Sequence, residues 1–144
     1  MLDFLFSSKN KKLVKKWHKE HEEIVELAHK VLGEYAKNRH DEAKAYLRKL
    51  NEVAVDHVMD EDIQLFKLTH EEKGIDQETE RMVHEFVDSF KKTKLAMMDF
   101  LSKYAKEEVP LDETFFKQFQ ELLDLLGKRI AFEEKEVYAK LKET

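Results

Sequence analysis

The chain has 144 residues, which is enough for one domain with a sizeable hydrophobic core and too few for two domains of ordinary size. It contains 40% charged and 42% hydrophobic residues with one proline and three glycines, a balance typical of an all-helical protein, since a β-rich fold would need more turn residues. The net charge of −5 gives no overall basic surface for nucleic acid, and the lack of cysteine excludes disulfides and thiolate sites. Any metal site must therefore use histidine nitrogen and carboxylate oxygen.

The start of the chain carries an apolar run at residues 2–6 followed by several lysines. This run is too short for a signal peptide, and no segment approaches the ~20 apolar residues that span a membrane. We therefore expect a cytoplasmic protein in which residues 1–8 form a short lead-in and residues 9–144 form the folded domain. A peripheral membrane anchor is the weaker interpretation of the same segment, behind a lead-in that covers one end of the domain or contacts a partner.

The first predicted helix is capped by Ser7 or Ser8 and ends at a turn over residues 38–41. Its inward positions recur at spacings of three and four: Val14, Trp17, His21, Ile24, Ala28, Val31 and Tyr35. His21 is thus a polar residue on an apolar seam. His18 and His29 each follow a seam residue and lie about 100° off the seam.

The second predicted helix is capped by Asp41 and stopped just after His70 by Gly74. Its inward stripe again mixes apolar and polar residues: Leu47, Leu50, Ala54, His57, Glu61, Leu65 and Leu68. His57 and Glu61 are one turn apart, so they point into the core together. An unpartnered buried polar group costs roughly 2–7 kcal/mol, so this pair requires a partner.

The third predicted helix is capped by Asp76 and carries one apolar face: Val83, Phe86, Val87, Phe90, Met97, Leu101 and Tyr104. His84 lies on the shoulder of that face, about 100° from its centre, and Asp88 lies a turn beyond. This helix therefore offers one histidine and one carboxylate near its apolar face.

The fourth predicted helix follows Pro110 and is capped by Asp112. Its seam contains two charged residues one turn apart: Phe119, Leu122, Leu126, Arg129, Glu133 and Val137. Gly127 beside them costs up to ~1 kcal/mol in helix propensity, and we expect it to admit a neighbouring side chain or backbone.

Four helices with short connections predict an all-α, up-down-up-down four-helix bundle. The polar seam residues lie at nearly matching distances from the connections, which predicts one internal layer containing His21, His57, Glu61, His84 and Glu133, with Asp88 as a further carboxylate. Histidine and carboxylate from facing helices can hold iron, manganese or zinc. The alternative is a hydrogen-bonded polar layer in which Arg129 neutralises the glutamates.

These residues resemble the hemerythrin-like, HHE cation-binding family over nearly the whole chain. The resemblance implies a four-helix bundle with a non-haem di-iron site. The positions that match the family's ligands are His21, His57, Glu61, His84 and Glu133. The departure is Arg129, which stands in the fourth helix where the family has histidine.

By this resemblance His21 and His57 ligate one iron, the third- and fourth-helix histidines ligate the other, and two carboxylates bridge them. Arg129 removes one ligand and adds a fixed positive charge, because arginine stays protonated in proteins and has no acceptor. Three outcomes remain: two ions with an impaired second site, one ion beside Arg129, or no metal. We expect the guanidinium to stand at the second cation's place and clamp both glutamates. His18 is the spare histidine nearby.

The resemblance implies a metal-binding protein rather than an enzyme, with one or two iron ions, for oxygen, nitric-oxide or redox sensing or iron handling. Its ligand would be a small diatomic molecule. The alternative is a metal-free four-helix bundle that acts as an interaction or regulatory module with a protein partner. Catalytic oxidation is disfavoured, because carboxylate di-iron sites are rich in glutamate and histidine predominates here.

Overall fold

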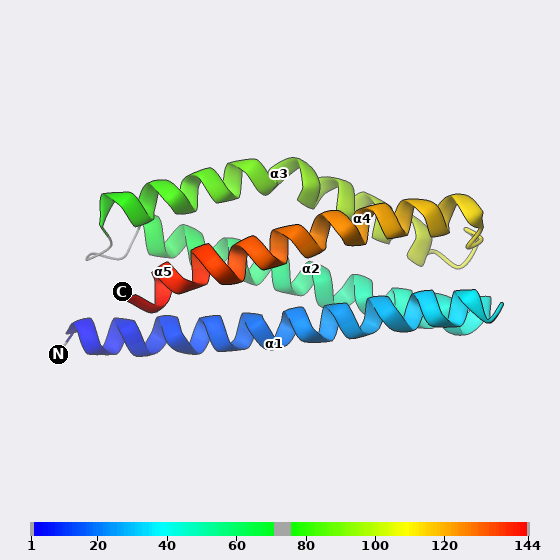
Figure 1. Ribbon diagram of the computed structural model, residues 1–144, viewed down its shortest axis with the longest axis horizontal. Coiled ribbons are helices and arrows are strands. Elements are labelled where there is room, and N and C mark those ends of the chain that lie inside the picture. Colours follow the sequence, from blue (N-terminus) through cyan, green and yellow to red (C-terminus); the bar gives the residue numbers. More distant parts are fainter. Residues whose placement is uncertain (1, 71–75, 144) are drawn as a thin grey trace.

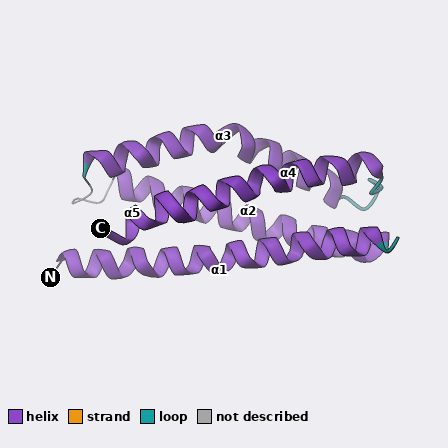
Figure 2. Ribbon diagram, in the orientation of Figure 1, coloured by secondary structure: helices purple, strands orange, loops and turns teal. Residues whose placement is uncertain are grey.

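The computed structural model describes residues 2–70 and 76–143, and the side chains of residues 9–70 and 76–142. Its four long helices are α1 (Leu2–Ala36), α2 (His40–His70), α3 (Gln77–Ala105) and α4 (Glu113–Phe132). The last runs into a π-helical turn, η1 (Glu133–Val137), and a short helix, α5 (Tyr138–Glu143). Successive helices run in opposite directions along one another, and the described residues contain no strand (Figures 1 and 2). The predicted up-down-up-down four-helix bundle is confirmed.

Two of the predicted helix caps form as expected. The Asp76 carboxylate accepts a hydrogen bond from the Thr79 backbone N–H at 2.6 Å, and the Asp112 carboxylate accepts one from the Phe115 N–H at 2.8 Å. Each bond satisfies a backbone donor that the first helical turn leaves without a partner.

The other predicted boundaries shift. Helix α1 already begins at Leu2, so Ser7 and Ser8 lie inside it and do not cap it. Helix α2 begins at His40, which places Asp41 in its first turn; the turn before it is made by Asn38 in the left-handed region at φ 62°. Asparagine tolerates this conformation better than most residues, so the chain reverses without a glycine. Gly74 lies outside the described residues.

The buried apolar residues form two clusters. One lies in the half of the bundle that ends at the α1–α2 and α3–α4 connections (Figure 1), and it includes Ile24, Val58 and Phe119. The other lies towards the opposite end and contains Trp17, Leu65, Val83, Tyr138 and Leu141. Along α1, His21 falls between Trp17 of one cluster and Ile24 of the other, and along α2, Glu61 falls between Val58 and Leu65, so these polar residues lie where the two apolar cores meet.

Gly127 does not play its predicted role. A Cβ added there would meet nothing within 4 Å, and the residue is exposed. No neighbour approaches closely because this position of α4 faces outward.

No helix in the described part of the chain is sufficiently long and apolar to cross a lipid bilayer.

Candidate metal centre

Two imidazoles meet between α1 and α2. The Nε2 atoms of His21 and His57 are 3.0 Å apart, and the two rings meet edge to face with centroids 4.6 Å apart. Both residues are buried, with 4% and 6% of their surface exposed. The predicted level pairing of these two histidines is therefore present.

The outer nitrogen of each histidine faces a carboxylate. His57 Nδ1 lies 2.7 Å from Glu20 Oε1, and His21 Nδ1 lies 3.1 Å from Glu134 Oε2. Each of these carboxylates can accept a hydrogen bond from the Nδ1–H beside it, and in that tautomer the Nε2 lone pair of each ring is directed into the core. Two lone pairs then face each other at 3.0 Å, an arrangement that a cation between them relieves.

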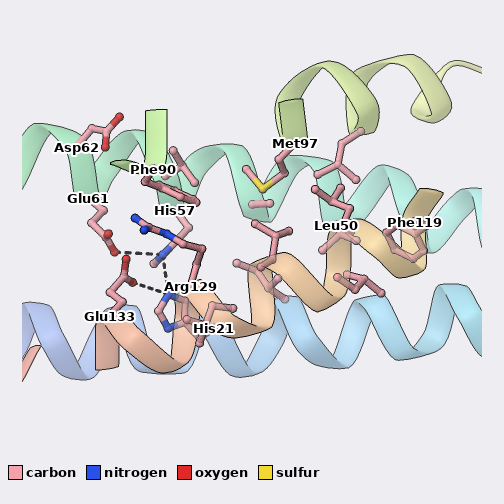
Figure 3. Close-up of a pocket in the computed structure, with 18 residues that line it drawn as sticks. His21, Leu50, His57, Glu61, Asp62, Phe90, Met97, Phe119, Arg129 and Glu133 are labelled. Carbon is pink, nitrogen blue, oxygen red and sulfur yellow. Dashed lines mark hydrogen bonds and ion pairs between the residues drawn. The ribbon is translucent and has the colours of Figure 1, made fainter. Parts of the chain in front are cut away.

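Two buried glutamates complete the cluster. Glu133 Oε1 lies 2.9 Å from His21 Nε2, and Glu61 Oε2 lies 3.3 Å from His57 Nε2. One ligand atom from each of the four residues lies within 4.8 Å of the other three, and no other group of this kind is found among the described residues. Burial, and then the negative charge of Glu133, raise the pKa of Glu61 well above its ordinary value. Figure 3 shows the four side chains turned towards one another at one end of a cavity.

Tyr138 is a fifth member of the cluster that the sequence reasoning missed. Its hydroxyl donates to Glu61 Oε2 at 2.9 Å and to Glu133 Oε1, and lies 3.4 Å from His21 Nε2. Burial, followed by the charges of Glu61 and Glu133, raises the pKa of the Tyr138 hydroxyl, so it keeps its proton and acts as a donor. A regular α-helical seam passes through Val137 instead, and no residue pattern signalled the wide turn that brings Tyr138 inward.

His84 does not join the layer, contrary to the sequence expectation. Its side chain is 52% exposed, its Nε2 is 4.0 Å from a Glu80 oxygen, and its ring meets the His70 ring edge-on. The reason is rotational: Val83 and Phe86 occupy the buried stripe of α3, and His84 follows Val83 by about 100°. The further carboxylate, Asp88, is exposed.

Arg129 does not clamp the glutamates. One guanidinium nitrogen donates to the Phe86 carbonyl oxygen and the other to Ser89 Oγ, each at 3.1 Å, and the group lies 4.5 Å and 4.6 Å from the Phe86 and Phe90 ring centroids. None of the ion pairs in the described residues joins Arg129 to Glu61 or Glu133. A carbonyl and two aromatic faces of α3 hold the guanidinium instead, and so tie α4 to α3.

His18, the spare histidine, lies outside the cluster. Its Nδ1 contacts Glu134 and its Nε2 lies 2.8 Å from Glu22 Oε1, and the ring is about half exposed. His18 therefore contacts Glu134, the carboxylate that orients His21, but does not reach the buried cluster.

A cavity of about 50 Å³ adjoins the four residues. Its remaining lining is mostly apolar and includes Leu50, Ala54, Val58, Met97 and Phe119. A cavity needs roughly 10–15 Å³ on the same measure to hold one water molecule, so this space can admit a small ligand.

The comparisons with known proteins agree with this geometry. The family model described as the hemerythrin HHE cation binding domain matches residues 12–141. No curated protein and no solved structure matches the chain. The matched residues cover α2, α3 and α4 completely and contain all four clustered residues. The chain belongs to the hemerythrin HHE cation-binding domain family.

Proposed function

We propose that this protein binds one iron ion between His21, His57, Glu61 and Glu133, and that the ion serves to sense or carry a small diatomic molecule. The observation that carries the proposal is the convergence of two histidine Nε2 atoms, 3.0 Å apart, on two buried glutamate side chains. Each of these four groups can donate an electron pair to a cation.

The spacing of the donor atoms suits a single ion. Bonds of ~2.0–2.1 Å from nitrogen and oxygen to a tetrahedral ion separate the donors by about 3.3 Å. The observed separations are 3.0 Å between the imidazoles, 2.9 Å from His21 to Glu133 and 3.3 Å from His57 to Glu61. Small outward movements would therefore admit the ion, and this mixed imidazole and carboxylate set suits iron, manganese or zinc.

The other half of the family's site supports one ion rather than two. His84 faces away from the cluster, and Arg129 stands on the α3–α4 side with a charge that it cannot lose. A second cation on the α3–α4 side would be repelled by the Arg129 guanidinium, and it would lack the histidine ligands that it needs there.

The adjoining cavity supports a diatomic ligand. An iron ion can take more ligands than the four donors of a tetrahedral site, so an additional ligand could bind it, and the mainly apolar lining favours an uncharged molecule such as oxygen or nitric oxide over an anion. The bound ion would supply the chemistry of ligand attachment, while the chain supplies orientation of the donors and exclusion of bulk water.

Ion binding is tested by titrating metal-free protein with Fe(II) without oxygen, and with Zn(II), by calorimetry and thermal melting. We expect about one equivalent and a higher melting temperature, because an ion that binds only the native state stabilises it. His29→Ala is the matched control, since His29 is an exposed histidine of the same helix. A melting temperature that neither Fe(II) nor Zn(II) changes would contradict the proposal and favour the metal-free interaction module.

The diatomic ligand is tested by adding nitric oxide to the Fe(II)-loaded protein and recording its visible absorption. We expect a spectral change that is weakened in Ala54→Leu, because the larger side chain fills the cavity beside the cluster. A spectrum that does not respond to nitric oxide would remove this part of the proposal and leave ion binding in place.

A further inference from the structure

Tyr138 is the buried hydroxyl that touches both carboxylates of the cluster. It donates to Glu61 on α2 and to Glu133 at the start of η1, which are far apart in the sequence. Its own surface is 2% exposed, so water does not compete for these contacts. The hydroxyl therefore joins the two glutamates at the point where their spacing decides whether both can bind one ion.

The π-helical turn explains how Tyr138 reaches this place. In a regular α-helix residues five apart are separated by about 140° around the axis, so Tyr138 and Glu133 would face different directions. In η1 the Tyr138 backbone N–H bonds to the Glu133 carbonyl, which is the i→i+5 bond of a π-helix and brings the two side chains onto one side. The wide turn places the phenol over the glutamate.

The phenol ring is fixed by aromatic neighbours. It stacks on His21 with centroids 5.7 Å apart at 12°, and it meets Trp17 at 5.6 Å. The Trp17 indole N–H in turn donates to Asp60 Oδ2 at 3.1 Å, next to Glu61 in the sequence. These contacts restrain the Tyr138 ring and therefore fix the position of its hydroxyl relative to the two glutamates.

When both are ionised, as the ligands of an ion are, Glu61 and Glu133 repel each other and would separate if nothing held them. A carboxylate offers about four lone-pair sites, so a hydroxyl that uses one on each glutamate leaves the others for an ion. Groups outside the coordination sphere that orient ligands in this way change metal affinity by roughly 10–100-fold.

We propose that Tyr138 is a positioning residue that holds Glu61 and Glu133 at ligand spacing and thereby sets the affinity of the site. This inference rests on the proposed function, because it concerns the same cluster. It adds a residue outside the His and Glu set and assigns a purpose to the π-helical turn.

The test compares Tyr138→Phe with Tyr104→Phe in the full chain. Both variants remove a phenol oxygen from a buried tyrosine, but Tyr104 lies in the other apolar cluster. The Kd for Zn(II) is measured against a competing chelator at constant pH, together with the melting temperature of the metal-free protein. We expect Y138F to raise the Kd by at least about tenfold while one equivalent still binds, and Y104F to change it by less than about twofold.

The outcomes separate the inference from the function on which it rests. Wild-type protein that binds no Zn(II) or Fe(II) overturns the proposed function and the inference together. Wild-type protein that binds one ion, with Y138F binding equally or more tightly, overturns the inference alone. A fall in melting temperature in both variants with no change in Kd would mean that the Tyr138 hydroxyl stabilises the fold without affecting the site, and would also overturn the inference.

A second variant covers a metal-free Y138F protein that still melts cooperatively but is too unstable for the measurement of the Kd. Glu61→Gln removes the repulsion between the carboxylates, so Y138F should lower the melting temperature less in that background than in the wild type. Equal losses in both backgrounds would show that the hydroxyl does not act through the glutamates, and would overturn the inference.

Discussion

The α1–α2 side and the α3–α4 side of the bundle both carry histidine and charged residues, but these residues are arranged differently on the two sides. On the α1–α2 side, His21 and His57 face each other in the core and each is oriented by an outer carboxylate. On the α3–α4 side, His84 lies at the surface and Arg129 is held by the Phe86 carbonyl. The first side is a set of donors ready for a cation, and the second supplies a cation of its own.

The difference teaches that a buried polar residue needs partners as well as a place on the seam. His21 and His57 lie on the central line of their helices and have Glu134 and Glu20 behind them. His84 lies one residue off its line, where it can reach water without loss. A shift of one position, about 100° of rotation, thus decides which histidines can meet a metal.

The largest expected effect separates the two sides by alanine substitution. His57→Ala should weaken Fe(II) or Zn(II) binding by more than about 100-fold, because losing a ligand costs more than the 10–100-fold loss of a group behind one. His84→Ala should change the affinity by less than about twofold. Equal losses in the two variants, measured by competition against a chelator, would show that His84 turns inward to bind the ion and that the contrast between the sides is wrong.

A histidine introduced at position 129 should not create a site for a second ion. Arg129→His should leave the count at about one equivalent, because His84 does not face the cluster. It should also lower the free energy of unfolding by about 1–3 kcal/mol, through loss of a charge-assisted hydrogen bond to the Phe86 carbonyl. Elemental analysis and denaturant unfolding measure both, with the exposed Arg81→His as control. Two ions per chain would show that the α3–α4 side is poised after all.

The stability of the metal-free protein should fall as pH rises above about 4.5, the ordinary pKa of a glutamate. The native state holds the Glu61 proton to higher pH than the unfolded chain, so it binds more protons in this window, and the slope is at most about 1.4 kcal/mol per pH unit. Bound metal, which displaces that proton, should remove the decline. Melting curves of wild type and Glu61→Gln check this, and a decline of the same size in the glutamine variant would contradict the assignment.

The smallest expected effect lies away from both sides. Gly127→Ala should stabilise the protein by up to about 1 kcal/mol, because alanine is the better helix former and its Cβ meets no neighbour. Its ion count should equal that of the wild type. A lower melting temperature would show that this stretch of α4 packs more closely than the structure indicates.

Much of the fold could be predicted because it depends on periodicity. The spacing of Trp17, His21 and Ile24, and the caps at Asp76 and Asp112, follow from local rules that the structure obeys. The pairing of His21 with His57 followed from their equal distances from one turn.

The rest of the cluster depends on features that no local rule encodes. Tyr138 enters through a π-helical turn, and periodicity of an α-helix predicts the opposite orientation. The Arg129 guanidinium contacts the Phe86 carbonyl oxygen and two aromatic rings rather than the glutamates. Which of these partners it contacts depends on the three-dimensional arrangement of α3 and α4. His84 misses the cluster in height as well as in angle, because its ring contacts His70, which lies nine residues beyond Glu61 on α2.

The most direct test is the metal content of the protein as isolated from iron-replete cells, measured by elemental analysis beside His21→Ala. The account predicts about one iron ion per wild-type chain and none in the variant, because His21 supplies one of four donors and contacts two others. Wild-type protein without metal, or equal metal in the two proteins, would contradict it.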